Sequence, residues 1–411
     1  MPPATAVNPA RQWDRLMTLA RLGAIPGDGV NRPCLSALDR EARRHIIAWA
    51  REVGATVSID AAANLFLRRE GSDPAAAAVL TGSHMDSQPE GGRFDGIYGV
   101  VAGLEAITAL HHAGITTSRA IEVVAWTNEE GGRFAPGCMG SMAWSGHSPL
   151  GTWSKVEDPQ GITFATALAD HLAAEADLAR RPLGSRPHAY LEAHIEQGPI
   201  LEAENTEIGI VTGIQGSRWF TVTITGASAH AGTAPVGRRQ DPVQDMLRAI
   251  AALNAVMADP TDTLRFTVGR IDVLPNTSNT VASQARFSID LRHPDRDTLL
   301  ASGDAIRPTI AAAVKTCRAT IDEHFHAMPV AFAPLVIDAV AQSAAALGHT
   351  ARRLPSGAFH DAQFVAPIAP TGMLFVPSRA GISHNPAEYT SPEHLAAGTR
   401  VLTEALTRLA S

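Results

Sequence analysis

Two different patterns of hydrophobic and polar residues follow one another along the chain. In the first half, residues 78–86, 121–127 and 189–195 are predicted to be buried strands, the first of which runs into a loop. A helix is predicted to start at Gly96, because apolar residues then recur at helical spacing: Ile97, Val100, Val101, Leu104, Ile107 and Leu110. Strands that alternate with helices indicate a largely parallel sheet covered on both faces. Ligands of such sheets gather at the carboxyl ends of the strands.

The pattern changes near residue 214. Residues 218–225 alternate between polar and apolar, as in a half-exposed antiparallel strand. The predicted elements that follow are a helix at 241–259, strands at 264–273 and 281–291, a long helix at about 295–319 and a strand near 328–332. This order is typical of a ferredoxin-type split βαβ unit. It would be an insertion, because the first pattern resumes after it, with a helix at 339–347, a buried strand at 372–376 and a helix from Ser391.

The predicted fold is therefore α/β, with a mainly parallel central sheet in a catalytic domain (1–213 and 333–411) and an inserted ferredoxin-like α+β domain (214–332). A length of 411 residues also favours two domains over one core.

Composition narrows the class of protein. The formal net charge of -7 is spread along the chain, which disfavours nucleic acid and anionic membranes as partners. No apolar stretch approaches the ~20 residues that cross a bilayer, and the N-terminus lacks the pattern of a secretory signal. Cys34, Cys138 and Cys317 are scattered and odd in number, which favours a reducing compartment over a disulfide framework. We expect a cytoplasmic enzyme.

Five residues stand at the ends of predicted strands or in the adjoining loops: His84, Asp95, Glu130, His194 and His384. Three imidazoles and two carboxylates suit Zn, Mn, Co or Ni. We predict two divalent metal ions, with Asp95 as the bridge because its Gly-bounded loop can fold closely around a site. His84 and His194 would complete one metal ion, and Glu130 and His384 the other.

Two further acidic residues complete the predicted chemistry. Glu129 is assigned as general base and then acid, because one of two adjacent carboxylates is best neutralised on a metal while the other carries protons. Asp86, two residues after His84, is predicted to accept the second ring N–H of that ligand. Paired acids are often only a solvated turn, and a lone histidine is usually a surface or core residue. The joint pattern favours the metal site over these alternatives.

At these residues the chain resembles the M20-type metallohydrolases, and more closely their hydantoinase/carbamoylase branch. That branch includes N-carbamoyl-L-amino acid hydrolases, allantoate amidohydrolases and β-ureidopropionases. The resemblance covers residues from about 17 to 409, and its motifs are GSHMDSQPEGGRFDG, TNEEGGRFAPGCMGS, LEAHIEQGP, HAGTAPVGRRQD and GISHNPAEY. M20 peptidases usually carry an acidic ligand where this chain has His194, so that histidine is specific to the branch.

The resemblance implies further roles at matching positions. His230 would stabilise the tetrahedral intermediate, Arg292 would pair with the substrate carboxylate, and Gln197 and Asn279 would contact the substrate. His360 would be a further active-site histidine. Structural roles stay open for His230, Arg292 and Asn279. The inserted domain would serve as lid and as the interface of a homodimer, with His230 and Asn279 arriving from a partner subunit.

The implied function is a metal-dependent hydrolase of C–N bonds other than peptide bonds. Its expected substrates are N-carbamoyl-L-amino acids, which would yield ammonia, CO2 and the amino acid. Allantoate and N-carbamoyl-β-alanine are alternatives, since one methylene changes discrimination by only ~1–3 kcal/mol. An M20 aminoacylase or peptidase is disfavoured by His194. A non-catalytic binding module of the same fold is disfavoured by the intact ligand set together with Glu129.

Overall fold

The computed structural model describes residues 3–411, and the chain forms two compact units. The first combines Met1–Gly213 with Ala331–Ser411, and the second is Ile214–Val330. Within the described residues, no helix has both the length and the apolar character needed to cross a membrane.

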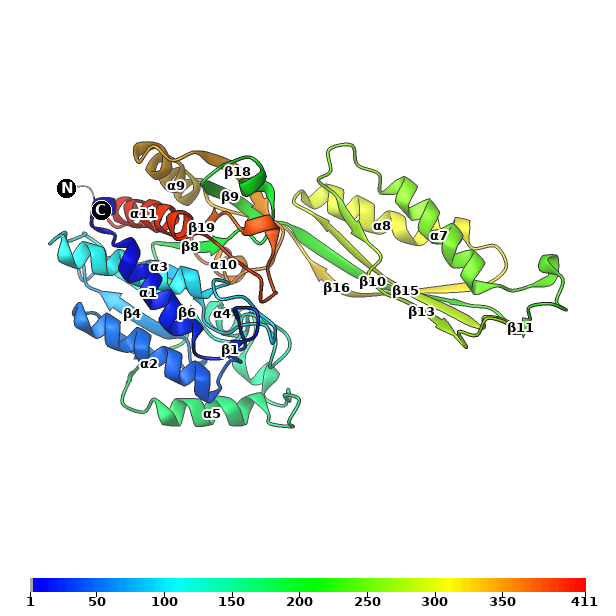
Figure 1. The fold of residues 1–411 in the computed structure, drawn as a ribbon, viewed down its shortest axis with the longest axis horizontal. Helices are drawn as coiled ribbons and strands as arrows, with labels where there is room; N and C mark the ends of the chain where they lie inside the picture. The colour runs from blue at the N-terminus through cyan, green and yellow to red at the C-terminus, as the bar shows by residue number, and fades with distance from the viewer. Residues whose placement is uncertain (1–2) are drawn as a thin grey trace. The chain divides into compact units, whose positions relative to one another are not determined.

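The first unit is built on a mixed sheet with a parallel centre (Figure 1). Its central order is β9-β19-β8-β5-β6-β4-β3, with β18 paired to β9 and β7 to β3. The pairs β19–β8, β8–β5 and β5–β6 are parallel, whereas β9 and β4 pair antiparallel with β19 and β6. The strands are β3 (Thr56–Ile59), β4 (Leu65–Arg69), β5 (Val79–His84), β6 (Ile121–Trp126), β7 (Ala179–Arg180), β8 (Ala189–Ile195), β9 (Ile208–Ile214), β18 (Ala351–Ser356) and β19 (Thr371–Val376), and a small hairpin joins β1 (Ala24–Ile25) to β2 (Gly29–Val30).

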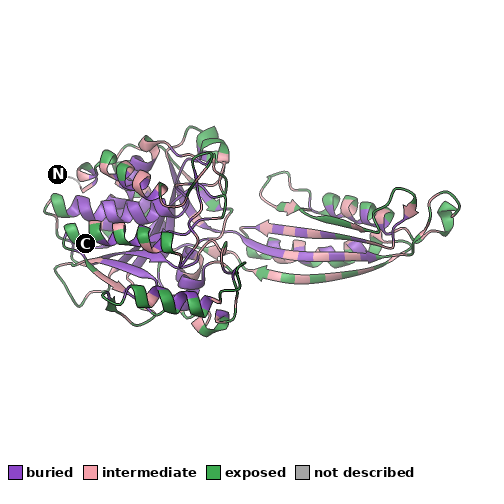
Figure 2. Ribbon diagram, turned by 60° about the horizontal axis from the view of Figure 1, so that its bottom comes forward, coloured by how far each residue is buried: buried purple, intermediate pink, exposed green. Residues whose placement is uncertain are grey.

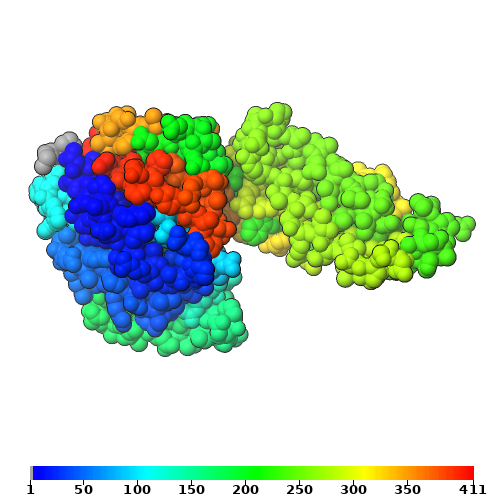
Figure 3. Space-filling view, in the orientation of Figure 1, coloured from blue at the N-terminus to red at the C-terminus, as the bar shows by residue number. Residues whose placement is uncertain are grey.

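Helices pack against this sheet, with α3 over β5 and β8 and α11 over β19 and β8. The helices are α1 (Pro9–Ala20), α2 (Ala37–Glu52), α3 (Ile97–His112), α4 (Met139–Ser145), α5 (Phe164–Ala174), α6 (Ile200–Ala203), α9 (Pro334–Ala346), α10 (Ala362–Val365) and α11 (Pro392–Leu409). Short 3-10 turns lie at Pro3–Ala6, Leu150–Trp153 and Arg379–Gly381. The N-terminal segment (blue) lies beside the C-terminal helix (red) in Figure 3, where Gln12 Nε2 donates to Thr399 Oγ1 at 2.7 Å.

Burial explains why the apolar runs predicted these strands. Every residue of β5, β6, β8 and β19 is buried, and these strands are uniformly purple in Figure 2. A strand covered on both faces buries side chains at successive positions, so its apolar residues are not confined to every second position. The predicted α/β fold with a mainly parallel central sheet is confirmed.

The second unit is an antiparallel sheet covered by two helices. Its strand order is β12-β15-β10-β16, with β13 also paired to β15. Alternate residues of β10 are buried, which gives the banded colouring in Figure 2, and they face a core that contains Phe220, Val222 and Ile224 with Leu253 and Ile306 of the helices. The elements are β10 (Gly216–Thr225), β11 (Ala229–His230), α7 (Pro242–Val256), β12 (Arg265–Thr267), β13 (Ile271–Leu274), β14 (Thr280–Val281), β15 (Gln284–His293), α8 (Arg296–Ala313) and β16 (Arg318–Ala327), with a 3-10 turn at Val236–Arg238. The short strand β17 (Val330–Ala331) that follows belongs to the sheet of the first unit, where it is the neighbour of β9.

Three predicted elements of this unit differ from the structure. The strand expected at 264–273 is interrupted between β12 and β13. Thr267 pairs with Asp290 and Ile271 with Phe287, so a step of four residues on this side faces a step of three residues on β15. One extra residue in a strand is a bulge, which local alternation does not reveal.

The long helix expected to reach residue 319 ends at Ala313, and the closing strand is β16 rather than 328–332. The cause is a long-range cap. The buried Asp245 carboxylate of α7 accepts the backbone N–H groups of Lys315, Thr316 and Cys317 at 2.7, 3.0 and 3.0 Å. These hydrogen bonds hold the backbone outside the helix just before β16 begins.

Candidate functional site

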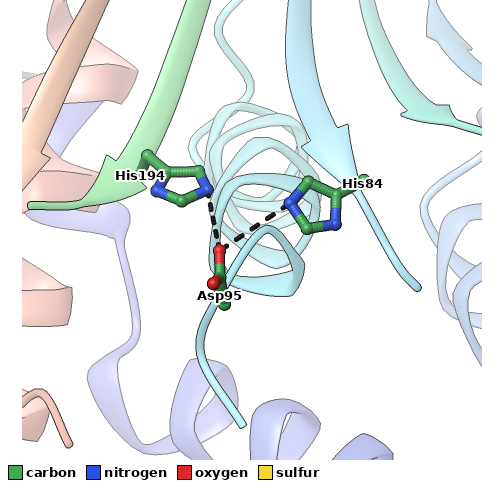
Figure 4. Close-up of side chains that lie close together, drawn as sticks. All are labelled: His84, Asp95 and His194. Carbon is green, nitrogen blue, oxygen red and sulfur yellow. Dashed lines mark ion pairs between the residues drawn. The ribbon is translucent and has the colours of Figure 1, made fainter. Parts of the chain in front are cut away.

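Three neighbouring parallel strands bring the predicted ligands to one edge of the sheet. His84 is the last residue of β5, His194 lies at the end of β8, and Glu129 and Glu130 follow β6 by three and four residues. Asp95 stands directly before α3 and faces both histidines (Figure 4).

The first group of candidate ligands consists of His84, Asp95 and His194, all buried. Asp95 Oδ1 lies 3.2 Å from His194 Nε2 and 3.8 Å from His84 Nε2. The Nδ1 atom of each ring faces a backbone carbonyl at 2.9 Å, that of Asp86 for His84 and that of Ile195 for His194. A carbonyl only accepts, so Nδ1 carries the proton and Nε2 presents its lone pair to the site.

The second group consists of Asp95, Glu130 and His384. His384 Nε2 lies 3.4 Å from Asp95 Oδ2 and 3.4 Å from Glu130 Oε2. Asp95 therefore belongs to both groups through different oxygens, with Oδ1 toward one pair of ligands and Oδ2 toward the other. That arrangement suits a carboxylate that bridges two cations.

The electrostatics of the two groups favour added positive charge. In the described part of the chain, the ion pairs of Asp95, Glu129 and Glu130 all have histidine as the partner. Burial and the charge of Asp95 raise the pKa of Glu130 to about 8. Burial works against ionisation of Asp95, but hydrogen bonds to His194 and His384 hold its pKa well below the usual value. The donor set fits Zn, Mn, Co or Ni, whose charge would offset the crowded carboxylates.

Glu129 lies beside the first group without belonging to it. Its Oε2 atom is 3.4 Å from His84 Nε2, and its Oε1 atom is 3.6 Å from Cys138 Sγ. Burial and the neighbouring carboxylates of Asp361 and Glu130 raise the pKa of Glu129 well above its usual value. A carboxylate with a raised pKa is suited to take a proton and return it near neutral pH.

Asp86 differs from its predicted role. The Nδ1–H of His84 donates to the backbone carbonyl of Asp86 at 2.9 Å, whereas the nearest carboxylate oxygen is 3.8 Å away. That carboxylate instead accepts the backbone N–H groups of Glu129 and Glu130, both at 3.3 Å. The prediction that the carboxylate orients the ring is wrong, because the backbone carbonyl of Asp86 faces Nδ1 while its carboxylate is bound to the loop after β6. Asp86 holds the loop after β6 instead.

Two other predicted residues lie in the same unit. Gln197 Nε2 donates to Asp95 Oδ2 at 3.0 Å and lies 3.2 Å from Ser383 Oγ. His360 is buried, with Nε2 3.0 Å from Ser356 Oγ and its ring centroid 4.5 Å from that of His194.

The remaining predicted residues lie in the second unit. His230 is exposed, and its Nδ1 accepts the N–H groups of Gly232 and Thr233 at 3.0 and 3.2 Å. Asn279 is exposed, and its backbone carbonyl accepts the backbone N–H of Ala231. The Arg292 guanidinium pairs with Asp290, and its Nη2 donates to Asp290 Oδ2 at 2.8 Å.

Sequence reasoning missed several residues that contact the ligands, among them Ser383, whose Oγ lies 3.1 Å from Asp95 Oδ2. Gln88 Nε2 donates to Glu130 Oε2 at 2.8 Å, and Glu388 accepts the backbone N–H of Asp95 at 3.1 Å. Both stand inside the motifs GSHMDSQPEGGRFDG and GISHNPAEY, in which only the metal-type side chains were singled out. Polar residues close to a ligand in these motifs were the available signal.

Gly96 gives the first test of the site. Its φ is +63°, and a Cβ built there would lie 2.2 Å from two atoms of the His84 ring. We expect Gly96→Ala to displace that ring and to weaken Mn²⁺ binding by at least about tenfold, as disturbed ligand orientation does. Calorimetric Mn²⁺ titration measures the change. Gly54→Ala is a matched control, since Gly54 also has positive φ (+74°) but a Cβ added there would meet no atom within 4 Å. Equal Mn²⁺ affinity in the two variants would contradict the prediction.

Comparison with known proteins identifies the family of the chain. The family model of Peptidase family M20/M25/M40 matches residues 80–408. The chain is 40% identical over 407 residues to an N-carbamoyl-L-amino-acid amidohydrolase of Rhizobium meliloti, covering 97% of this chain and 96% of that protein. It is 33% identical to an allantoate amidohydrolase of Bacillus subtilis, covering 97% of each.

A solved structure is also similar over nearly the whole chain. An amidase of the hydantoinase/carbamoylase family from Burkholderia multivorans matches with a TM-score of 0.93 and 43% identity, covering 98% of each chain. The chain therefore belongs to Peptidase family M20/M25/M40, in its hydantoinase/carbamoylase branch.

Proposed function

We propose that the protein is a di-metal amidohydrolase that cleaves the carbamoyl C–N bond of N-carbamoyl-L-amino acids. The observation that carries this proposal is Asp95, shared between two ligand groups, with the raised-pKa carboxyl of Glu129 beside them. The names of relatives such as the 40% identical Rhizobium protein support the substrate class. The products would be ammonia, CO2 and the amino acid.

In this proposal His84 and His194 would hold one cation, Glu130 and His384 would hold the other, and Asp95 would be shared by the two sets of ligands. When bound, the two ions supply Lewis acidity that polarises the scissile carbonyl and lowers the pKa of water. Glu129 Oε2 takes a proton from the attacking water. It then returns that proton to the departing nitrogen, so the C–N bond breaks without expelling an amide anion.

The second unit would supply substrate contacts, as lid and as the interface of a homodimer. His230 is suited to stabilise an oxyanion, since its Nδ1 accepts two backbone N–H groups and its proton is therefore on Nε2. Arg292 would bind the substrate carboxylate, for which its planar guanidinium fork is suited. That fork is bound to Asp290 in this structure, so a substrate carboxylate would have to replace Asp290 as its partner. Asn279, Gln197 and His360 complete the proposed substrate contacts.

Other substrates of the same chemistry are the second candidates. The Bacillus subtilis relative supports allantoate, although its identity is lower at 33% against 40%. N-Carbamoyl-β-alanine would need the residue that binds its carboxylate, Arg292 in this proposal, to lie one methylene further from the scissile bond. An aminoacylase or peptidase activity is disfavoured by His194, which replaces the acidic ligand usual in M20 peptidases.

An ammonia-release assay of the Mn²⁺-loaded protein tests the proposal. N-Carbamoyl-L-amino acids, N-carbamoyl-β-alanine and allantoate would be run side by side, with N-acetyl-L-amino acids assayed for amine release. We expect the highest kcat/KM with an N-carbamoyl-L-amino acid and loss of turnover on chelation. Faster turnover of allantoate would move the assignment to the second candidate. Turnover of the N-acetyl compounds alone would reject the carbamoyl assignment.

A further inference from the structure

We propose that Glu388 is a positioning residue that fixes the bridging carboxylate Asp95 and the His384 loop relative to one another, and thereby sets the metal affinity of the site. This inference rests on the proposed function only in requiring that the site binds divalent cations. Glu388 is separated by 293 residues from Asp95 and stands four residues after His384.

The Glu388 carboxylate is fully engaged on the ligand loop. It is 1% exposed, and its Oε1 atom accepts two consecutive backbone N–H groups, that of Phe94 at 3.0 Å and that of Asp95 at 3.1 Å. Two donors that converge on one oxygen fix both the position and the orientation of the peptide that carries Asp95. The direction of the Asp95 side chain follows from that peptide.

The other oxygen reaches the His384 loop through Ser383. Glu388 Oε2 lies 2.9 Å from Ser383 Oγ, and the same hydroxyl lies 3.1 Å from Asp95 Oδ2. Asp95 Oδ2 is the oxygen that faces His384 Nε2 at 3.4 Å. The Glu388 carboxylate therefore binds the backbone of Asp95 directly. Through Ser383, the residue before His384, it is also linked to Asp95 Oδ2.

The opposite loop leaves space for this carboxylate. A Cβ built at Gly92 would lie 2.0 Å from Glu388 Oε1 and 2.1 Å from its Cδ. Gly92 does not have positive φ, so the absence of a side chain there is explained by space and not by backbone conformation. The loop that carries Asp95 is thus shaped around Glu388.

A purely structural role is the competing explanation, and Asp60 supplies the matched control. Asp60 is also 1% exposed, and its Oδ1 accepts two backbone N–H groups, of Ala62 at 2.9 Å and Asn64 at 3.0 Å. Its Oδ2 accepts the Asn64 side chain at 2.9 Å. Asp60 makes these bonds to a turn and not to a ligand loop, so a loss of stability alone should follow its substitution.

Calorimetric titration of the chelator-stripped full chain with MnCl2 tests the proposal, alongside thermal unfolding. Glu388→Ala is expected to weaken Mn²⁺ binding by about 10–100-fold, the usual effect of residues that orient ligands. Glu388→Gln should recover most of that affinity, because its amide oxygen still accepts the two N–H groups and its NH2 still reaches Ser383. Asp60→Asn should lower Tm while keeping wild-type Mn²⁺ affinity.

Wild-type Mn²⁺ affinity in Glu388→Ala, with a lowered Tm only, would overturn the proposal. If Glu388→Ala does not fold, Ser383→Ala decides, since it removes only the bridging hydroxyl. About tenfold weaker Mn²⁺ binding would support the link, and unchanged binding would reject it. Calorimetry uses no substrate, so a wild-type protein that binds Mn²⁺ but releases no ammonia would reject the proposed function and leave this inference intact.

Discussion

The Glu129→Gln variant is expected to bind Mn²⁺ as the wild type does and to lose kcat by about 10²–10⁴-fold, the contribution of a positioned general base. The reason is chemical, because an amide of the same shape fills the space beside His84 but cannot take a proton from water. Glu129 Oε2 lies 3.4 Å from His84 Nε2 and the residue is absent from both ligand groups, so metal content should not change. Metal analysis and steady-state ammonia release measure the two quantities separately.

The neighbouring residue provides the contrast for this experiment. Glu130→Gln removes a member of the second ligand group and should therefore lower both metal content and kcat. If Glu129→Gln kept wild-type turnover, Glu129 would not be the base. If it lost metal as Glu130→Gln does, Glu129 would be a ligand and the roles of the two adjacent acids would have to be exchanged.

Asp95→Asn is expected to weaken binding of both cations by more than about 100-fold, since even residues outside the ligand set contribute 10–100-fold. The carboxylate is shared, with Oδ1 3.2 Å from His194 Nε2 and Oδ2 3.4 Å from His384 Nε2. An amide offers one oxygen only, and its NH2 group would donate to an imidazole that must instead face a metal. Turnover should be lost together with the metal.

Calorimetry with MnCl2 on the stripped protein measures this loss directly. Asp158→Asn is a suitable control, because Asp158 is a buried carboxylate that accepts the N–H groups of Gln160 and Ile162 and pairs with Arg133. It should bind Mn²⁺ normally. Two equivalents of tightly bound Mn²⁺ in Asp95→Asn would show that this carboxylate is not the bridge.

The buried strands could be predicted because their signal is local. Apolar residues of β5, β6 and β8 are not confined to every second position, as expected where both faces of a strand are buried. His84 and His194 stand at the ends of such strands, and Glu130 follows one. These positions placed the three residues at a common edge, since neighbouring parallel strands end on the same side. Short spacings within the chain were enough for these inferences.

Other features depend on residues far apart in sequence. The end of α8 is set by Asp245, which binds backbone groups about 70 positions later, so helical periodicity continued past the true end. The choice between the carbonyl and the carboxylate of Asp86 depended on the loop after β6, more than 40 positions later, whose N–H groups bind the carboxylate. The role of Glu388 appears only when two loops meet.

The sequence by itself determined the α/β class, the buried strands and the set of metal-type side chains at their ends. Those properties follow from hydrophobic periodicity and residue chemistry, which are encoded within a few positions. The tertiary structure alone decided which oxygen of Asp95 faces which histidine, which nitrogen of each ring is free, and which carboxylate holds the bridging loop. These depend on hydrogen bonds between distant segments, whose geometry is set only when the whole unit packs.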